Sequence, residues 1–84
     1  MNTDHTLIIK TGNFSETQKK IIASLAVSPD HFIKKIAEAI QEASVYGGEV
    51  KFNDFSENPL FKKHSGEALK MWTLVRNNIV QANP

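Results

Sequence analysis

The sequence predicts a mostly helical α+β fold for these 84 residues, with three helices and two short strands in the order β-α-α-β-α. Three observations support this prediction. Residues that favour helix starts occur twice in the first third of the chain, at Ser15 and at Ser28. A long apolar stripe with helical spacing covers residues 67–80. Two short segments, 6–10 and 49–55, are instead β-branched or alternating, so we expect two strands.

The first helix is predicted to begin at a capping box. Ser15 can accept a hydrogen bond from the backbone N–H of Gln18, and the Gln18 side chain can reach back to the Ser15 N–H. The turns that follow carry three apolar residues on one face: Ile21, Ile22 and Leu25. We therefore expect a helix from Ser15 to the tight connection at residues 26–29.

A second helix is predicted directly after this connection. Ser28 is the expected cap, Pro29 occupies the first helical position, and Asp30 places a negative charge in the positive field of the helix start. The apolar stripe of this helix consists of Phe32, Ile33, Ile36, Ala37, Ala39, Ile40 and Ala43. The Gly47–Gly48 pair is expected to end it, because glycine adopts the left-handed conformation of a helix C-cap without a Cβ clash.

Residues 17–36 also carry a recognisable run: Thr17, Gln18, Ile21, Leu25, Ala26, Val27, Ser28, Phe32 and Ile36. This run resembles the helix-turn-helix signature of bacterial DNA-binding proteins over about 20 of the 84 residues. In that family a Thr-Gln pair opens the first helix and a Gly-Val-Ser turn follows a leucine. Two positions depart from the pattern, because Ala26 replaces the usual glycine and Ile22 replaces a small alanine.

The resemblance implies that the second helix enters the major groove of DNA. The candidates to reach base edges are then Ser28, Asp30, His31 and Lys34. The candidates to contact the phosphate backbone are Lys19, Lys20 and Lys35. Asp30 opposes this interpretation, because a carboxylate repels phosphates, and the region contains no arginine to read guanine. The alternative is that these charges only solvate an ordinary helical hairpin.

The C-terminal half is predicted to supply the main core helix. Asn58 and Pro59 suit the cap and first position of a short helical turn, and Ser65 is a further candidate cap. The long stripe that follows consists of Ala68, Trp72, Val75 and Ile79. Trp72 is expected to be buried against the stripe of the second helix, formed by Phe32, Ile36 and Ile40.

The two predicted strands are expected to pair, with residues 50–53 beside residues 7–10. Two strands alone are barely stable in water, so they need a helix beneath them or a second copy of the chain beside them. A homodimer is therefore expected.

Composition bounds the remaining possibilities. A chain of this length that is 40% apolar and 23% charged forms one globular domain, with residues 1–5 and 82–84 expected to fray. It contains no cysteine and no apolar run long enough for a bilayer, which favours a cytoplasmic protein without disulfides. The net charge of +1 does not favour phosphate binding, although residues 10–35 hold five lysines and only two carboxylates.

Catalytic chemistry is not predicted. His5, His31 and His64 lie on separate elements without metal-ligand spacing, and no glycine-rich phosphate loop precedes a helix. We therefore expect no enzyme, no metal and no cofactor.

Three functions follow from these observations. The first is a DNA-binding regulator that uses Lys19, Lys20, Ser28, His31, Lys34 and Lys35. The second is a small protein-binding inhibitor or adaptor, such as a phage- or plasmid-type immunity or anti-defence protein. The third is a ribbon-helix-helix repressor, which is disfavoured because Thr6, Ile8 and Lys10 read DNA poorly. A DNA-binding protein should gather its lysines on one face, whereas a protein-binding module should show an apolar or acidic patch.

Overall fold

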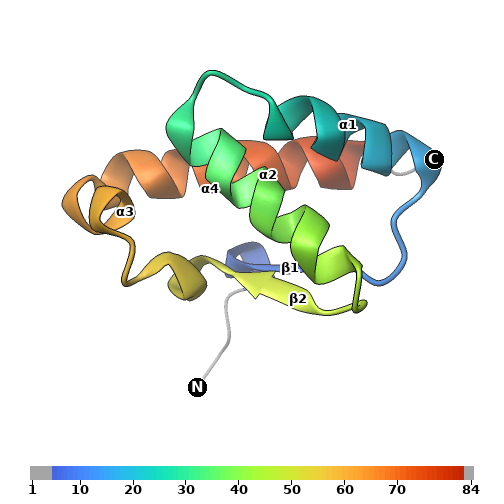
Figure 1. Ribbon diagram of the computed structural model, residues 1–84, viewed down its shortest axis with the longest axis horizontal. Helices are drawn as coiled ribbons and strands as arrows, with labels where there is room; N and C mark the ends of the chain where they lie inside the picture. Colours follow the sequence, from blue (N-terminus) through green and yellow to red (C-terminus); the bar gives the residue numbers. More distant parts are fainter. Residues whose placement is uncertain (1–4, 83–84) are drawn as a thin grey trace.

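A computed structural model describes residues 5–82 and has the predicted mostly helical α+β architecture. In chain order its elements are η1 (His5–Leu7), β1 (Ile8–Lys10), α1 (Glu16–Ala26), α2 (His31–Ser44), β2 (Glu49–Lys51), η2 (Phe52–Phe55), α3 (Pro59–Lys63) and α4 (Ser65–Gln81). Helix α2 packs against α1, α4 and β2, and it runs obliquely across the other helices (Figure 1). The order matches the prediction, with the expected short turn at Pro59 forming the additional five-residue helix α3.

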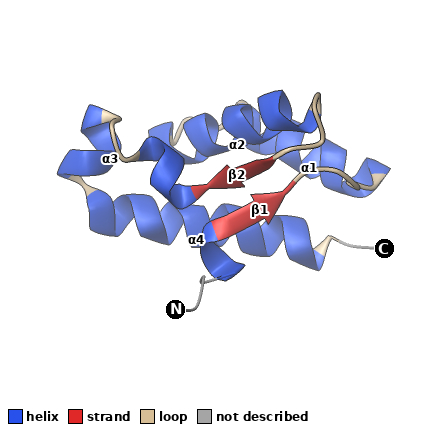
Figure 2. Cartoon of the chain, turned by 90° about the horizontal axis from the view of Figure 1, so that it is seen from below, coloured by secondary structure: helices blue, strands red, loops and turns tan. Residues whose placement is uncertain are grey.

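The two strands form an antiparallel sheet on one side of the helices (Figure 2). Ile8 pairs with Lys51, Ile9 with Val50, and Lys10 with Glu49, so the predicted pairing of the two segments is confirmed. Both strands are shorter than predicted, because each is adjacent to a 3-10 helix. The N–H of Lys51 donates to the Asp54 carboxylate at 2.9 Å, which turns the chain from β2 into η2.

The capping box predicted for α1 is present. The Gln18 N–H donates to Ser15 Oγ at 3.1 Å, and the Ser15 N–H donates to Gln18 Oε1 at 2.9 Å. Gln18 is also buried, because its Nε2 donates to the backbone oxygen of Ile79 at 2.9 Å in the last turns of α4. One side chain therefore fixes the start of α1 and joins it to the C-terminal helix.

The predicted cap of α2 is wrong by two residues. Asp30 is the N-cap, and its Oδ1 accepts hydrogen bonds from the N–H groups of Phe32 and Ile33 at 2.9 and 3.0 Å. Ser28 instead accepts from the Asp30 N–H at 3.1 Å, and Pro29 precedes the cap. A carboxylate is the stronger acceptor at the positive end of a helix, so Asp30 displaces the hydroxyl of Ser28 from the capping position.

Helix α2 ends at Ser44, ahead of the glycine pair that was predicted to end it. The turn that follows closes with Gly47 at a φ of 67°, in the left-handed region. Gly48 N–H donates to the oxygen of Ala43 at 3.1 Å, and Gly47 N–H donates to that of Ser44 at 3.3 Å. This pair of bonds is a Schellman-type closure, so glycine has the predicted conformation at the end of the cap.

Asn58 caps α3 as predicted, accepting from the N–H groups of Leu60 and Phe61 at 2.9 and 3.3 Å, with Pro59 first in the helix. The predicted cap at Ser65 is wrong, because Ser65 is already the first residue of α4. His64 precedes it without a side-chain capping bond. The two helices follow each other so closely that no residue remains for a separate cap.

The core is one cluster, and it contains both predicted stripes. Ala68, Trp72, Val75 and Ile79 of α4 are all buried, together with Phe32, Ile36 and Ile40 of α2. Trp72 is completely buried, as predicted. Its ring contacts Phe52 and Phe55 of η2 in edge-to-face geometry, and its indole N–H donates to the backbone oxygen of Thr6 at 2.6 Å.

The ends of the chain were predicted to fray. Residues 1–4 and 83–84 lie outside the described part of the structure. His5 begins η1, and the Ala82 N–H donates to the backbone oxygen of Asn78 at 3.2 Å. His5 and Ala82, which were expected to fray, therefore take part in the described fold. Between residues 5 and 82, no helix combines the length and the apolar character needed to cross a membrane.

We predict that Trp72→Ala lowers the free energy of unfolding by about 3–5 kcal/mol, because it leaves a large cavity and removes the indole N–H that donates to the Thr6 oxygen. Denaturant unfolding followed by circular dichroism measures this loss. Leu74→Ala is the matched control, since Leu74 is 40% exposed on the same helix. A Trp72→Ala protein that melts within a few degrees of the parent would contradict the packing described above.

We also predict that Asp30→Ala costs about 1 kcal/mol of stability, whereas Ser28→Ala costs clearly less. Asp30 accepts two helix N–H groups, while Ser28 accepts only one bond within the turn. The two variants are compared by urea unfolding under the same conditions. A larger loss in Ser28→Ala would restore Ser28 as the functional cap of α2.

Candidate functional site

The lysines proposed to contact DNA are all exposed, and they come from two helices. Lys19 and Lys20 lie on α1, and Lys34 and Lys35 lie on α2. Consecutive residues of a helix project about 100° apart, so each pair diverges. Lys19 also forms an exposed ion pair with Glu16 at 3.5 Å, which contributes little to stability.

Carboxylates balance these lysines. Over residues 15–44 four lysines stand against four acidic residues, Glu16, Asp30, Glu38 and Glu42. Glu38 and Glu42 are exposed on α2, about one and two turns beyond Lys34 and Lys35. The excess of three lysines over residues 10–35 therefore falls to one when the second half of α2 is included.

The other two candidates for DNA contact are His31 and Ser28. His31 is exposed in the first turn of α2, while the Ser28 hydroxyl is half-buried and accepts the Asp30 N–H. Val27, in the same connection, is 79% exposed. Among residues 5–82, no side-chain hydrogen bond or ion pair joins any two of the six candidates.

Helices α1 and α2 lie beside each other in antiparallel fashion. Lys19 and Ile22, in the first turns of α1, line one hollow together with Ile40, Gln41 and Ser44, near the end of α2. The start of α1 therefore lies near the end of α2, and α2 crosses α1 obliquely (Figure 1).

A cluster of aromatic rings occupies the opposite end of α2. Five of the seven aromatic residues take part: Phe32, Phe52, Phe55, Phe61 and Trp72. Phe55 stacks on Phe61 with ring centroids 4.6 Å apart, and Phe32 meets Phe61 edge-to-face at 5.2 Å. Phe32, Phe61 and Trp72 are buried, whereas Phe52 and Phe55 are half-buried. The outer two rings therefore remain open to the surface.

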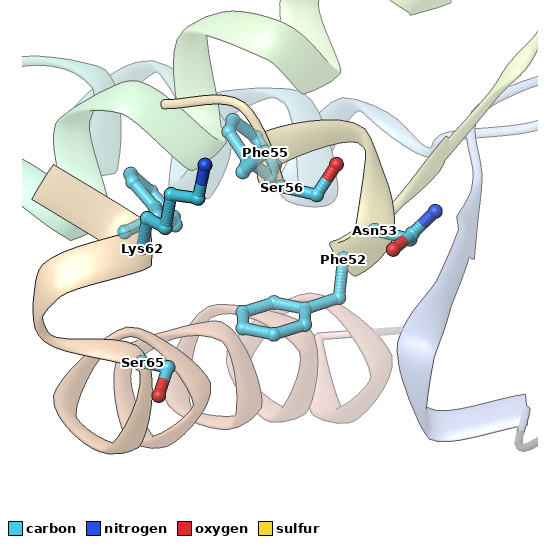
Figure 3. A pocket seen from close by; sticks show the side chains of 7 residues that line it. Phe52, Asn53, Phe55, Ser56, Lys62 and Ser65 are labelled. Atoms are coloured by element: carbon cyan, nitrogen blue, oxygen red, sulfur yellow. The ribbon is translucent and has the colours of Figure 1, made fainter. Parts of the chain in front are cut away.

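An open pocket of about 200 Å³ lies against these outer rings. Its lining residues are Phe52, Asn53, Phe55, Ser56, Phe61, Lys62 and Ser65. Phe52 and Ser65 line the side next to α4 (Figure 3). Phe55, Ser56 and Lys62 line the opposite side (Figure 3). The walls are mainly aromatic, and Lys62 is the charged member of the lining.

The size of the pocket limits what it can hold. Small-molecule sites usually measure about 300–1,000 Å³, so this pocket is smaller than most of them. An apolar cavity of about 150 Å³ holds one benzene molecule. The pocket therefore matches a single aromatic or branched aliphatic side chain.

The sequence does not predict this pocket, because the alternation of residues 49–55 indicates an extended strand. In η2 the chain instead forms a 3-10 helix, with about three residues per turn. Phe52 and Phe55 are three residues apart and consequently project to the same side. The FxxF spacing was the available signal, but a strand would have placed the two rings on opposite faces.

Comparison with protein-family models, with curated proteins and with solved structures finds no match to this chain. Within residues 5–82 no group of three or more histidine and acidic side chains is placed to hold a metal ion. The function must therefore be inferred from the charge balance of the helical hairpin and from the aromatic pocket.

Gln18 belongs to the helix-turn-helix resemblance, but here it is a buried structural bridge. We predict that Gln18→Ala costs about 1–3 kcal/mol, because it removes the acceptor of the Ser15 N–H and leaves the Ile79 oxygen without its partner. Lys20→Ala, at an exposed position of the same helix, should change stability by at most about 0.5 kcal/mol. Urea unfolding monitored by Trp72 fluorescence measures both, and equal effects would refute the bridging role.

Proposed function

We propose that the protein is a small non-enzymatic inhibitor or adaptor that acts by binding another protein. The observation that carries this proposal is the open pocket walled by Phe52, Phe55 and Phe61. Protein interfaces typically gain most of their affinity from a few side chains inserted into well-packed pockets, surrounded by a polar rim. Asn53 and Ser56 supply such a rim.

The aromatic pocket is also supported from beneath. Phe52 and Phe55 both contact the ring of Trp72, and Phe55 stacks on Phe61. Because Trp72 is fixed in the core, its neighbours lose little further freedom when a partner binds. Preorganisation of this kind raises affinity by lowering the entropic cost of association.

DNA binding is the second candidate. Lys20, Lys34, Lys35 and His31 are exposed, which favours it, but the carboxylates of α2 cancel the positive field that phosphates require. The ribbon-helix-helix alternative is weaker still, because β1 pairs with β2 of the same chain.

The proposal includes a cytoplasmic location, supported by the absence of cysteine from the sequence. The homodimer expected from the short sheet has less support than the protein-binding function. The Lys51 N–H of β2, which does not bond to β1, already donates to the carboxylate of Asp54. That carboxylate protects this edge of the sheet against a further strand.

The experiment that tests the proposal is a titration of the isotope-labelled protein with N-acetyl-phenylalaninamide, followed by amide chemical shifts. We expect shifts confined to residues 52–65 and saturation in the millimolar range, because one ring makes few contacts. N-acetyl-alaninamide is the control and should produce no such shifts.

A parallel titration with double-stranded DNA at about 50 mM salt decides between the two candidates. We expect no binding by fluorescence anisotropy. Binding that falls steeply with salt, and that Lys34→Glu/Lys35→Glu weakens, would favour the DNA-binding candidate if the phenylalanine probe gave no local shifts.

A further inference from the structure

We infer that the pocket receives an aromatic or branched aliphatic side chain from an acidic segment of the partner protein. This inference rests on the proposed function and adds the chemistry of the segment that binds. Its basis is the position of Lys62 at the margin of an otherwise uncharged, aromatic pocket (Figure 3).

Lys62 is available for an ion pair with the partner. It is exposed, it lines the pocket, and no carboxylate within residues 5–82 lies in ion-pairing distance of it. None of the acidic side chains in the described part of the chain lines the pocket. A carboxylate close to the inserted side chain would therefore meet an unpaired ammonium group and no opposing charge.

The last turn of α3 adds to this positive margin. Lys62 and Lys63 are its final residues, and His64 follows directly. Basic residues at the end of a helix also interact favourably with its carbonyl groups, which is a structural role that both lysines share. Only Lys62 lines the pocket. Lys63 therefore provides a control that has the same charge and lies in the same last turn of α3.

The pocket favours a peptide over a single-stranded nucleic acid, although a nucleotide also combines a ring with an anion. Bases bound by stacking lie flat on exposed aromatic faces, whereas this pocket is small, at about 200 Å³, and three rings line it. A base inserted into it would bury polar edge atoms against Phe52, Phe55 and Phe61, which offer no hydrogen bonds. A phenylalanine or leucine side chain has no such atoms to desolvate.

The test uses four synthetic pentapeptides with blocked ends. Three carry a central phenylalanine between two flanking residues on each side, which are all aspartate, all serine or all lysine. The fourth has alanine at the centre of the aspartate peptide. Each is titrated at about 50 mM salt against the parent protein and against Lys62→Glu and Lys63→Glu, with amide shifts of residues 52–65 as the readout.

We expect the aspartate peptide to bind the parent protein roughly three- to tenfold more tightly than the lysine peptide, as befits a partly exposed ion pair. Lys62→Glu should reverse this order, and Lys63→Glu should preserve it. Both substitutions change the net charge equally and place an acid at the same helix end, so the difference between them reports the contact with the bound peptide.

Several other results would overturn the inference, and each of them can be told apart from the rest. Equal binding of all three phenylalanine peptides, or equal effects of the two variants, would refute the acidic partner while leaving the protein-binding pocket intact. Loss of the difference between phenylalanine and alanine would refute both proposals. An oligothymidylate that shifts the same amides more strongly than the peptides would assign the pocket to nucleic acid instead.

Discussion

Complete burial of Trp72 is the constraint on which the rest of this structure depends. An indole N–H removed from water needs an acceptor, and the backbone oxygen of Thr6 supplies it at 2.6 Å. That bond ties the N-terminal segment to α4. The large ring also needs neighbours on its outer side, and Phe52 and Phe55 of η2 provide them. Both bordering 3-10 helices therefore contact the same side chain, which accounts for strands shorter than their sequence patterns predict.

The same packing generates the candidate site. Covering Trp72 brings Phe52 and Phe55 to one side of η2, and Phe55 then stacks on Phe61 of α3. The rings of Phe52 and Phe55 each cover the core with one face and line the pocket with the other. Stability and binding are consequently coupled here, since truncating either ring would alter the support of Trp72 as well as the pocket. Lys62 is different, because it is exposed and can be changed without touching the aromatic cluster.

The sequence predicted those features that depend on neighbouring residues. The capping box of Ser15 and Gln18 and the cap at Asn58 involve contacts only two or three residues apart, and the stripe of α4 follows from helical periodicity. Prediction from the sequence failed where two neighbouring residues can both cap a helix, as Ser28 and Asp30 can at the start of α2. It also failed where a distant residue decides, because Trp72 helps to convert the alternating segment into η2. The lysines were predicted to be exposed, and Lys19, Lys20, Lys34 and Lys35 all lie at the surface of α1 and α2.

The balance of charge limits the ways in which the protein can recognise a partner. A ligand that is steered from a distance requires an extended field of one sign, and a net charge of +1 with a neutral helical hairpin supplies none. Recognition must then depend on contacts made at short range. An aromatic pocket works in this way, because apolar burial begins only when the surfaces touch. A single unpaired ammonium group at its margin selects among partners after contact and adds little to the rate of encounter. In the proposed interaction, specificity therefore depends on the position of Lys62 beside the pocket and not on the number of lysines in the chain.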